Sequence, residues 1–366
     1  MVSSIHRISV AEQVATALRE GIRSGVWVDF LPAEHELARR FCVGRYSVRA
    51  ALARLARDGL IVIAKGKRTR IRPQPRKDPA SAPPTVCVVA PSAPGAPTLI
   101  GHHVLLEVHA ELAAQSIGWE EVLDARLDGR HPEPHLQQLA AGRRNVCWLL
   151  VSVSAAVQRW FEKAGVPVVV VGTCHAGVKI PSVDTDYRAI GWHAAGFMTQ
   201  YGHRHVAMVL PQRPMPGDLA CRDGFADYVT KRKCPMLVAE VPAGTSQSAL
   251  QLKLDRIMTR RQRPTAILSL VARNTLSVLF YLQQRRLQVP QDVSLVSADT
   301  HILLEQGIPE ITRYRISTKK QARRIVRLVQ SLLTGHAVPA KPSLITPTFV
   351  IGSTLARQAG ATNLPG

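Results

Sequence analysis

The first part of the chain takes its fold from residues 31–61, which read LPAEHELARRFCVGRYSVRAALARLARDGLI. Apolar residues recur there at helical spacing in two stretches, at about 33–41 and 44–58, with a short turn between them. Gly44 can serve as the N-cap of the second stretch, and Gly59 follows its end, as is common at helix C-termini. The pattern therefore predicts two helices joined by a tight turn.

A further helix is predicted before this pair, at about residues 10–24. The apolar positions that share one face of a helix are expected to pack together: Val14, Leu18 and Ile22 on the first helix, and Val48, Leu52 and Leu55 on the third. Residues 1–72 are thus predicted to form a three-helix domain with its own small core.

The third helix carries basic side chains on a different face. Arg45 and Arg49 are four residues apart, and Ser47 lies near them at the start of the helix. Guanidinium groups at the N-terminal end of a helix can enter the major groove of DNA and bond guanine edges in bidentate fashion. The helix N-terminus also favours a nearby phosphate. These residues are therefore candidates for DNA recognition.

The segment LIVIAKGKRTRIR, at residues 60–72, alternates apolar and polar residues around a basic turn. This pattern predicts a two-stranded wing, whose cations would reach the minor groove or the phosphates: Lys65, Lys67, Arg68 and Arg70, with Gly66 at the turn. A solvated basic helix on a small bundle is the alternative interpretation. The three helices, the basic helix start and the basic hairpin together favour a winged helix-turn-helix domain of the α+β class that binds double-stranded DNA.

The charge of the whole chain agrees with this interpretation. Lys and Arg outnumber Asp and Glu by 47 to 26, which gives a formal net charge of +21. Residues 1–72 alone hold fourteen basic and six acidic side chains, a net charge of +8. Such a balance points to a polyanionic partner, either nucleic acid or an acidic membrane surface.

A domain boundary is predicted at residues 73–84, which read PQPRKDPASAPP and include five prolines. Proline blocks helix and ladder formation, so this segment should act as a stiff linker. A large domain is expected at 85–355, followed by a short tail at 356–366.

The large domain alternates strand-like and helical segments. Apolar runs rich in β-branched residues are predicted to be strands at 85–91, 146–153, 166–172, 205–211, 265–271 and 293–298. Helices are expected at about 101–117, 187–201, 218–232 and 274–285. Continuous apolar strands between helices are typical of parallel sheets covered on both faces, so an α/β fold is predicted.

The segment at 31–61 also resembles the GntR family of bacterial repressors, which read LPSERELA and, after a turn, VSRTTVREALRRLEAEGL. The resemblance implies that Arg45 and Arg49 contact DNA, with Ser47 as the small hydroxyl residue and Gly66 as the first wing glycine. Three features depart from the family pattern. Gly44 replaces the usual serine, and Arg68 stands where a second wing glycine is common. Val28, Asp29 and Phe30 replace the family's proline-glycine before LP.

The large domain resembles the effector domain of the LacI family. The resemblance rests on PSVDTDYRAIGWHAAGFMTQYGHRHVAMV at 181–209, RDGF at 222–225, PTAILSL at 264–270 and VPQDVSLVSAD at 289–299. It implies a two-lobed, periplasmic-binding-protein-like fold with parallel sheets and a ligand cleft between the lobes. GntR-type heads joined to such domains occur in arabinose-type repressors.

The same resemblance suggests three effector-binding residues, Asp186, Arg222 and Asp299. Asp299 follows the VSLV strand, where a carboxylate could accept hydrogen bonds from two hydroxyls. Asp186 opens a helix, so a helix N-cap is the alternative and the favoured role for it. Arg222 is one residue away from the position of the family's cleft arginine. The family's Asn-Asp pair falls on 271–272, here Val-Ala, so the cleft should suit a less polar effector or has lost the family's sugars.

Enzymatic chemistry is not expected. The sequence holds no G-x-S-x-G, H-E-x-x-H, P-loop or G-x-G-x-x-G motif, and no cofactor or metal site is indicated. The six cysteines form no C-x-x-C pair and are interpreted as buried free thiols in a reducing compartment. No apolar run is long enough to span a bilayer, and no leader is evident, so a cytoplasmic protein is expected, nucleoid-associated when bound to DNA.

These observations predict a transcriptional regulator, more specifically a repressor, that acts as a homodimer on an operator. Its affinity for DNA would respond to a small-molecule effector, a sugar or related metabolite, in the cleft. The alternative is a regulator or architectural protein whose large domain is a degenerate sensor serving only dimerisation.

Overall fold

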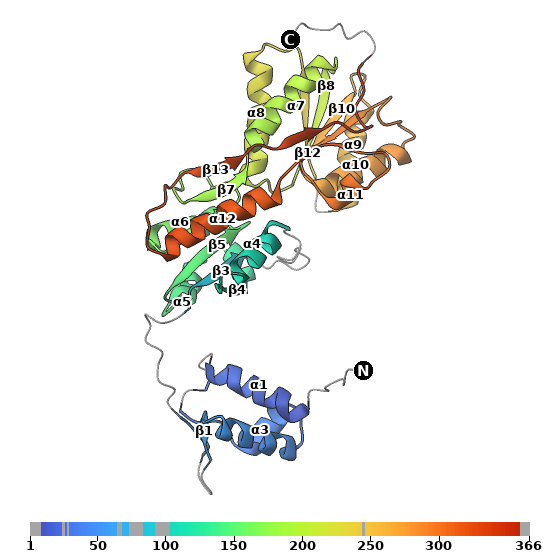
Figure 1. Ribbon diagram of the computed structural model, residues 1–366. Coiled ribbons are helices and arrows are strands. Elements are labelled where there is room, and N and C mark those ends of the chain that lie inside the picture. The colour runs from blue at the N-terminus through green and yellow to red at the C-terminus, as the bar shows by residue number, and fades with distance from the viewer. Residues whose placement is uncertain are drawn as a thin grey trace, which may run out of the picture. The chain divides into compact units, whose positions relative to one another are not determined.

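The computed structural model of the chain describes residues 9–23, 26–27, 29–63, 68–72, 83–91, 103–243 and 246–358. The chain divides into two units, Met1–Ala82 and Pro83–Gly366, which are described separately below (Figure 1).

The first unit is a three-helix domain with a two-stranded sheet. Its elements are α1 (Val10–Arg23), α2 (Glu34–Arg40), α3 (Arg45–Arg57), β1 (Ile61–Val62) and β2 (Arg70–Ile71). The two strands pair in antiparallel fashion, with Ile61 opposite Ile71. The core collects one apolar face from each element: Val14, Ala15, Leu18, Leu31, Leu37, Val48, Ala51, Leu52, Leu55, Ile61 and Ile71. The predicted winged helix-turn-helix fold is therefore confirmed.

The second unit contains two lobes, each built on a six-stranded sheet. The sheet of the first lobe has the order β13-β7-β6-β5-β3-β4, and all its pairs are parallel. Its strands are β3 (Thr85–Ala90), β4 (Gly118–Leu123), β5 (Val146–Val151), β6 (Val168–Val171), β7 (Ser182–Thr185) and β13 (Pro342–Ile345).

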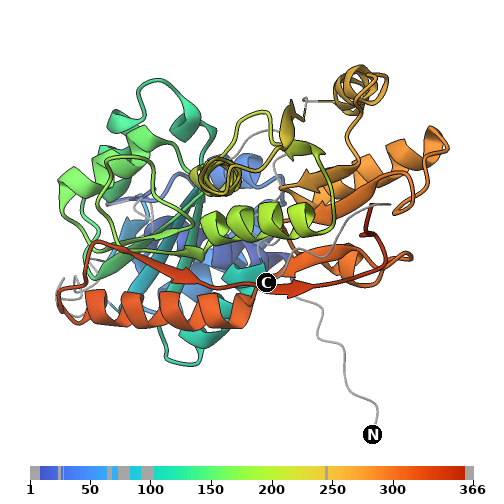
Figure 2. The same cartoon turned by 90° about the horizontal axis from the view of Figure 1, so that it is seen from above.

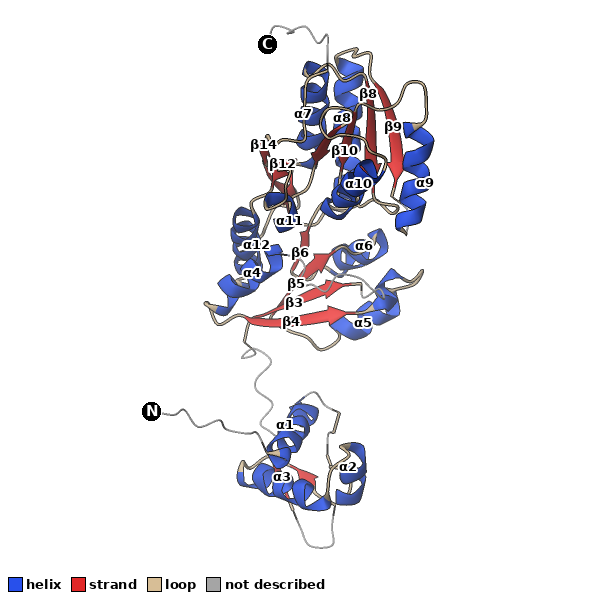
Figure 3. Ribbon diagram, turned by 90° about the vertical axis from the view of Figure 1, so that its right-hand side faces the viewer, coloured by secondary structure: helices blue, strands red, loops and turns tan. Residues whose placement is uncertain are grey.

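Helices cover both faces of this first sheet. Helices α4 (His103–Ala113) and α12 (Thr318–Leu333) pack on one face, and α5 (Glu133–Ala140) and α6 (Ala155–Ala164) pack on the other (Figure 3). A 3₁₀ turn at Ala125–Asp128 precedes α5. Because side chains alternate along each strand, Val86 and Val88 face the first pair of helices while Cys87 and Val89 face the second.

The sheet of the second lobe has the order β14-β12-β11-β10-β8-β9. Its strands are β8 (His205–Leu210), β9 (Leu237–Pro242), β10 (Ala266–Ser269), β11 (Ser294–Ser297), β12 (Thr312–Arg315) and β14 (Thr348–Val350). Helices α7 (Tyr187–Gln200) and α8 (Pro216–Lys231) cover one face, while α9 (Gln247–Met258) and α10 (Ala272–Gln284) cover the other. The short helix α11 (Ile302–Glu305) follows β11.

The chain passes between the lobes three times, at 185–187, 315–318 and 345–348. The first and third crossings are joined by a hydrogen bond of 3.0 Å from the Asp186 amide to the Ile345 carbonyl. Gln321 on α12 donates to the Thr185 hydroxyl at 3.1 Å. The third crossing, between β13 and β14, starts beside α12 (Figures 1 and 2). Such clustered crossings give the lobes a common hinge.

The two-lobed α/β fold with parallel sheets is also confirmed, and three details of the chain differ from expectation. Strand β14 pairs with β12 in antiparallel fashion, because the chain enters the edge of the sheet after its last crossing. Cys42 is exposed in the turn between α2 and α3, so the expectation that the free thiols are buried is wrong there. The lobe's contacts continue past residue 355, since the Ala356 amide donates to Ser294 Oγ at 3.1 Å.

Candidate functional site

The start of α3 is an exposed part of the first unit. Gly44 is its N-cap and offers no side-chain acceptor, so the first amides of the helix have no capping side chain. Arg45 and Arg49 are both exposed, as predicted for residues that point away from the core, and Ser47 is half-buried between them. Tyr46 is 87% exposed. Tyr46 lies in the first turn of α3 beside Arg45, so its exposed side chain joins the candidate DNA contacts by position.

Arg49 is held by a residue that the sequence did not indicate. Its Nε lies 2.7 Å from Glu34 Oε2 on α2, while the arginine side chain remains 69% exposed. This exposed ion pair contributes little to stability. Its effect is to orient the guanidinium, whose two Nη groups stay available for a base edge or a phosphate.

The wing is described only in part. Arg68 and Arg70 are exposed, and Arg70 lies in β2. Lys65, Gly66 and Lys67 lie outside the described residues. The two described arginines therefore place positive charge on the hairpin that follows α3.

In the second unit, a cavity of about 170 Å³ lies where the lobes meet. We call it the Asp184 cavity. The first lobe contributes residues from the ends of β5, β6 and β7 and from α6, and the second contributes the starts of α7 and α8: Ser152, Gln158, Val170, Val171, Gly172, Thr173, Asp184, Tyr187, Met215, Pro216, Gly217 and Asp218. Ligands of open α/β sheets bind outside the carboxyl ends of the strands, which is where this cavity lies.

The carboxylates at this cavity are fixed by hydrogen bonds. Asp184 accepts from the Thr173 hydroxyl at 2.6 Å and from the Thr185 amide at 2.7 Å. Asp218 accepts from the Met215 amide at 2.8 Å and so caps α8. Burial raises the pKa of Asp184. Burial and, to a smaller extent, the charges of Asp299 and Asp184 raise the pKa of Asp218 to about 6.

The three residues predicted to bind the effector occupy different settings. Asp299 is close enough to this cavity for its charge to act on Tyr187 and Asp218. Its carboxylate accepts from the amides of Ala272 at 3.1 Å and Thr300 at 2.8 Å, and burial raises its pKa. Asp186 accepts from the Ala189 amide at 2.9 Å and is the N-cap of α7.

Arg222 is turned toward its own helix. Its Nη2 lies 2.8 Å from Asp223 Oδ1, and it is not among the residues that line the Asp184 cavity. The structure therefore places Asp299 near the cavity but not among its lining residues, uses Asp186 as a cap and leaves Arg222 in a surface ion pair. Asp184, Asp218, Tyr187 and Gln158 were missed. Only Asp184 had a signal in the sequence, a carboxylate at the end of a buried strand.

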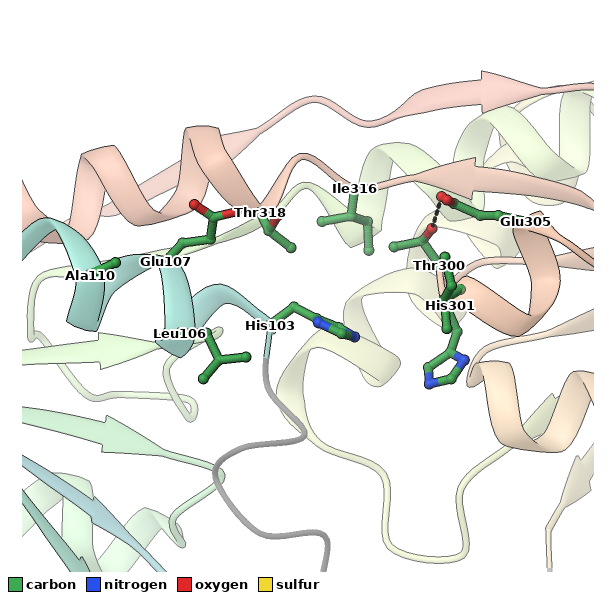
Figure 4. A pocket seen from close by; sticks show the side chains of 10 residues that line it. His103, Leu106, Glu107, Ala110, Thr300, His301, Glu305, Ile316 and Thr318 are labelled. Carbon is green, nitrogen blue, oxygen red and sulfur yellow. Dashed lines mark hydrogen bonds between the residues drawn. The ribbon is translucent and has the colours of Figure 1, made fainter. Parts of the chain in front are cut away.

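A larger cavity of about 430 Å³ lies between α4 and the segment around α11 (Figure 4). His103 and His301 point toward one another across it, with ring centroids 6.3 Å apart. The Thr300 hydroxyl donates to Glu305 at 3.1 Å. Ile316 and Thr318, at the second lobe crossing, complete its wall. Movement at the hinge would change this cavity as well as the Asp184 cavity.

The raised pKa of Asp218 predicts that the free energy of unfolding of the second unit depends on pH. Its pKa is higher in the folded chain than the unfolded value of 3.8, so stability is lost as pH rises from about 4 to about 6. Asp218→Asn keeps an acceptor for the Met215 amide and removes the charge. We expect it to stabilise the unliganded second unit by about 1–2 kcal/mol at pH 7.5. Thermal unfolding at both ends of this range measures the effect, and an equal gain at pH 4 would contradict it.

Within the described ranges, no group of three or more His, Cys, Asp or Glu side chains is arranged to hold a metal ion. None of the described helices is long and apolar enough to cross a membrane.

Comparison with known proteins matches the two units separately. Residues 10–71 match the profile of bacterial regulatory proteins of the gntR family, and residues 195–355 match a periplasmic binding protein-like domain. The chain is 23% identical to the arabinose metabolism transcriptional repressor of Geobacillus stearothermophilus, over 74% of this chain and 75% of that protein. It is 26% identical to catabolite control protein A of Priestia megaterium, over 41% of this chain and 46% of that protein, so the match spans less than half of that relative.

The head alone has a nearer relative. Over 67 residues, 18% of this chain and 26% of the other, it is 45% identical to the transcriptional repressor NanR of Klebsiella aerogenes. Among solved structures, a complex of the transcriptional regulator CelR with cellobiose superposes with a TM-score of 0.63 at 18% identity, covering 88% of this chain and all of that one. A LacI family regulator from Enterococcus faecium with bound ribose has a TM-score of 0.61 at 15% identity, covering 75% and 99%. These superpositions establish the fold.

Proposed function

Because the chain joins a winged helix of the gntR family of bacterial regulatory proteins to a periplasmic-binding-protein-like domain, we propose that it is a transcriptional regulator controlled by a small molecule. The head binds a DNA operator, and the effector binds between the lobes. The observation that carries the proposal is the exposed start of α3, where Arg45, Tyr46 and Arg49 face solvent above a complete winged-helix core.

The proposal assigns roles to the parts of the chain. Residues 1–72 form the DNA-binding domain, 73–84 the linker, 85–355 the effector-binding and dimerisation domain, and 356–366 the tail. Arg45, Ser47 and Arg49 enter the major groove, while Lys65, Gly66, Lys67 and Arg68 form the wing that contacts the backbone. Two copies of the chain, as a homodimer in the cytoplasm, would place two recognition helices on a pseudo-palindromic site.

Coupling between the effector cleft and the DNA-binding domain would regulate operator binding. Closure of the lobes around an effector would alter the spacing or orientation of the two heads in the dimer. A coupling free energy of about 1–3 kcal/mol would change operator affinity roughly 5- to 150-fold. The effector is a sugar or a related metabolite, a class suggested by the cellobiose and ribose bound to the two structural neighbours. Asp299 is its anchor in the cleft, and we propose that the chain represses transcription until the effector binds.

Selection from random duplexes tests the DNA-binding part of the proposal. The full-length protein should enrich a sequence with two related half-sites, and fluorescence anisotropy should give a far higher affinity for it than for a scrambled duplex at the same salt concentration. Enrichment of no sequence, with equal affinity for all duplexes, would contradict sequence-specific binding. Thermal-shift screening of metabolites, followed by operator competition, tests the effector part.

The wing makes a separate prediction about salt. Each Lys or Arg that neutralises a phosphate adds about 0.9 to the slope of log affinity against log salt concentration. The double substitution Lys67→Ala, Arg68→Ala should therefore lower the slope by about 1.8 and weaken binding to all sequences alike. Anisotropy titrations over a range of salt concentrations measure it. An unchanged slope would show that the wing does not contact DNA.

A further inference from the structure

The Asp184 cavity is acidic, although the chain as a whole has a net charge of +21. Asp184 and Asp218 line it, and Asp299 lies near enough for its charge to act on both Tyr187 and Asp218. The described residues that line the cavity include no Lys, Arg or His. The negative charge gathered here therefore has no cation of the chain among the lining residues.

The two lobes bring these groups together at short range. A Cβ atom built on Gly217, in the second lobe, would lie 2.9 Å from the ring of Tyr187 and 3.5 Å from Asp184 Oδ2. Asp184 belongs to the first lobe, so a carboxylate of one lobe faces the start of α8 in the other. A ligand held between Asp184 and Asp218 would touch both lobes at once.

The hydrogen bonds within the cluster hold the carboxylates in place without neutralising them. Each one accepts from backbone amides or a hydroxyl, and these donors carry no full charge. Partly buried carboxylates that repel one another are costly to keep ionised. A cation placed among them would remove the repulsion and restore their ionisation.

Gln158 provides an independent indication of a ligand. Its side chain is only 2% exposed and lines the same cavity. Its Oε1 accepts from the His175 amide at 2.8 Å, but its Nε2 has no hydrogen-bond partner among the described residues. Because this amide group is not enclosed by protein and Gln158 lines the cavity, it is free to donate a hydrogen bond to a bound acceptor. The Tyr187 hydroxyl, also at the cavity, has no protein partner in the described part of the chain either.

We propose that the Asp184 cavity binds a small ligand that carries a protonated amine together with hydroxyl groups, as an amino sugar or an amino alcohol does. The ammonium group lies between Asp184 and Asp218, and the Gln158 amide donates to a ligand hydroxyl. This inference rests on the proposed function, because it names the chemical class of the effector. It also predicts what is rejected, since a phosphorylated or carboxylated ligand would meet the same carboxylates.

The helix N-termini at the cavity do not reverse the preference for a cationic over an anionic ligand. Asp218 is within the first turn of α8 and caps the Met215 amide, and Ser154 caps α6 by accepting from the Val157 amide at 3.5 Å. Their positive ends are thus already partly occupied by oxygen acceptors of the chain. An anion would gain little from them and would face the carboxylates.

Isothermal titration calorimetry of the full-length protein with glucosamine and 2-aminoethanol tests the proposal, with glucose, glucosamine 6-phosphate and the hydroxyl-free amine putrescine as comparisons. At least one of the two amino alcohols should bind saturably, and glucose and the phosphorylated sugar should bind at least tenfold more weakly than glucosamine. Asp184→Asn and Asp218→Asn should each weaken amine binding roughly ten- to hundredfold, the range for a hydrogen bond to a charged group.

Asp223→Asn is the control, because it removes an acidic group from α8 that pairs with Arg222 away from the cavity. It should leave amine binding unchanged. Glucose binding as tightly as glucosamine, no saturation by glucosamine or 2-aminoethanol at millimolar concentration, or equal effects of all three substitutions would each overturn the proposal. Operator binding, measured on the same preparations, separates this result from a failure of the proposed DNA-binding function.

Discussion

Arg45→Ala in the full-length chain is expected to weaken binding to the selected operator roughly 5- to 150-fold, because a bidentate arginine–guanine contact contributes about 1–3 kcal/mol of discrimination. Arg45 is exposed in the first turn of α3, so its removal should leave the melting temperature unchanged. Arg49→Ala should have an effect of similar size. Anisotropy with the operator and with a scrambled duplex measures both affinities.

Arg57→Ala is the matched control for this pair. Arg57 is exposed and lies at the opposite end of the same helix, so its loss removes the same charge without touching the recognition end. If Arg45→Ala and Arg57→Ala weakened operator binding equally, the contribution would be general electrostatics and the assignment of α3 as the recognition helix would be wrong. A loss for the operator alone, with scrambled DNA nearly unaffected, is the expected pattern.

The head could be predicted from the sequence because its determinants are local. Helical periodicity placed Val48, Leu52 and Leu55 on the buried face of α3, and all three are buried. Glu34 was missed because its role depends on a contact between helices. The ion pair between Glu34 and Arg49 joins residues fifteen positions apart, which only the packing of α2 on α3 brings together.

The lobes were predictable where strands are buried on both faces. The runs at β3, β5, β8, β10 and β11 are continuous and apolar, so they could be recognised as central strands. Edge strands gave weaker patterns. The exposed positions of β9 and β13 dilute the apolar signal, and β14 is only three residues long.

The cleft was the least predictable part, since its residues come from both lobes. Asp299 illustrates the difficulty. Val271 cannot cap α10 with its side chain, and Asp299, from the next strand, accepts from the Ala272 amide in its place. Asp299, which the sequence predicted to bind the effector, is thus partly used to cap α10 in the absence of a polar residue at 271. Asp299→Asn is for this reason a cleaner test of ligand binding than Asp299→Ala.

The close contact between α7 and α8 depends on two glycines that face the partner helix. A Cβ on Gly191 would lie 1.8 Å from the Cys221 carbonyl oxygen, and one on Gly224 would lie 2.1 Å from the Arg188 carbonyl oxygen. Both obstacles are backbone atoms, so only separation of the helices could make room. The same two helices carry Tyr187 and Asp218 to the Asp184 cavity.

Gly191→Ala is therefore expected to destabilise the second unit by roughly 3 kcal/mol, at the upper end of the cost of overpacking. Helix propensity alone would give the opposite sign, because alanine is favoured over glycine in a helix by about 1 kcal/mol. Thermal and urea unfolding followed by circular dichroism measure the change. Thr230→Ala, at an exposed position near the end of α8, is the control and should be nearly neutral. If α7 and α8 are in close contact, the substitution should also separate Tyr187 from Asp218 and abolish amine binding, even where the variant remains folded. A stabilised Gly191→Ala protein that still binds the ligand would mean that the helices are not in close contact.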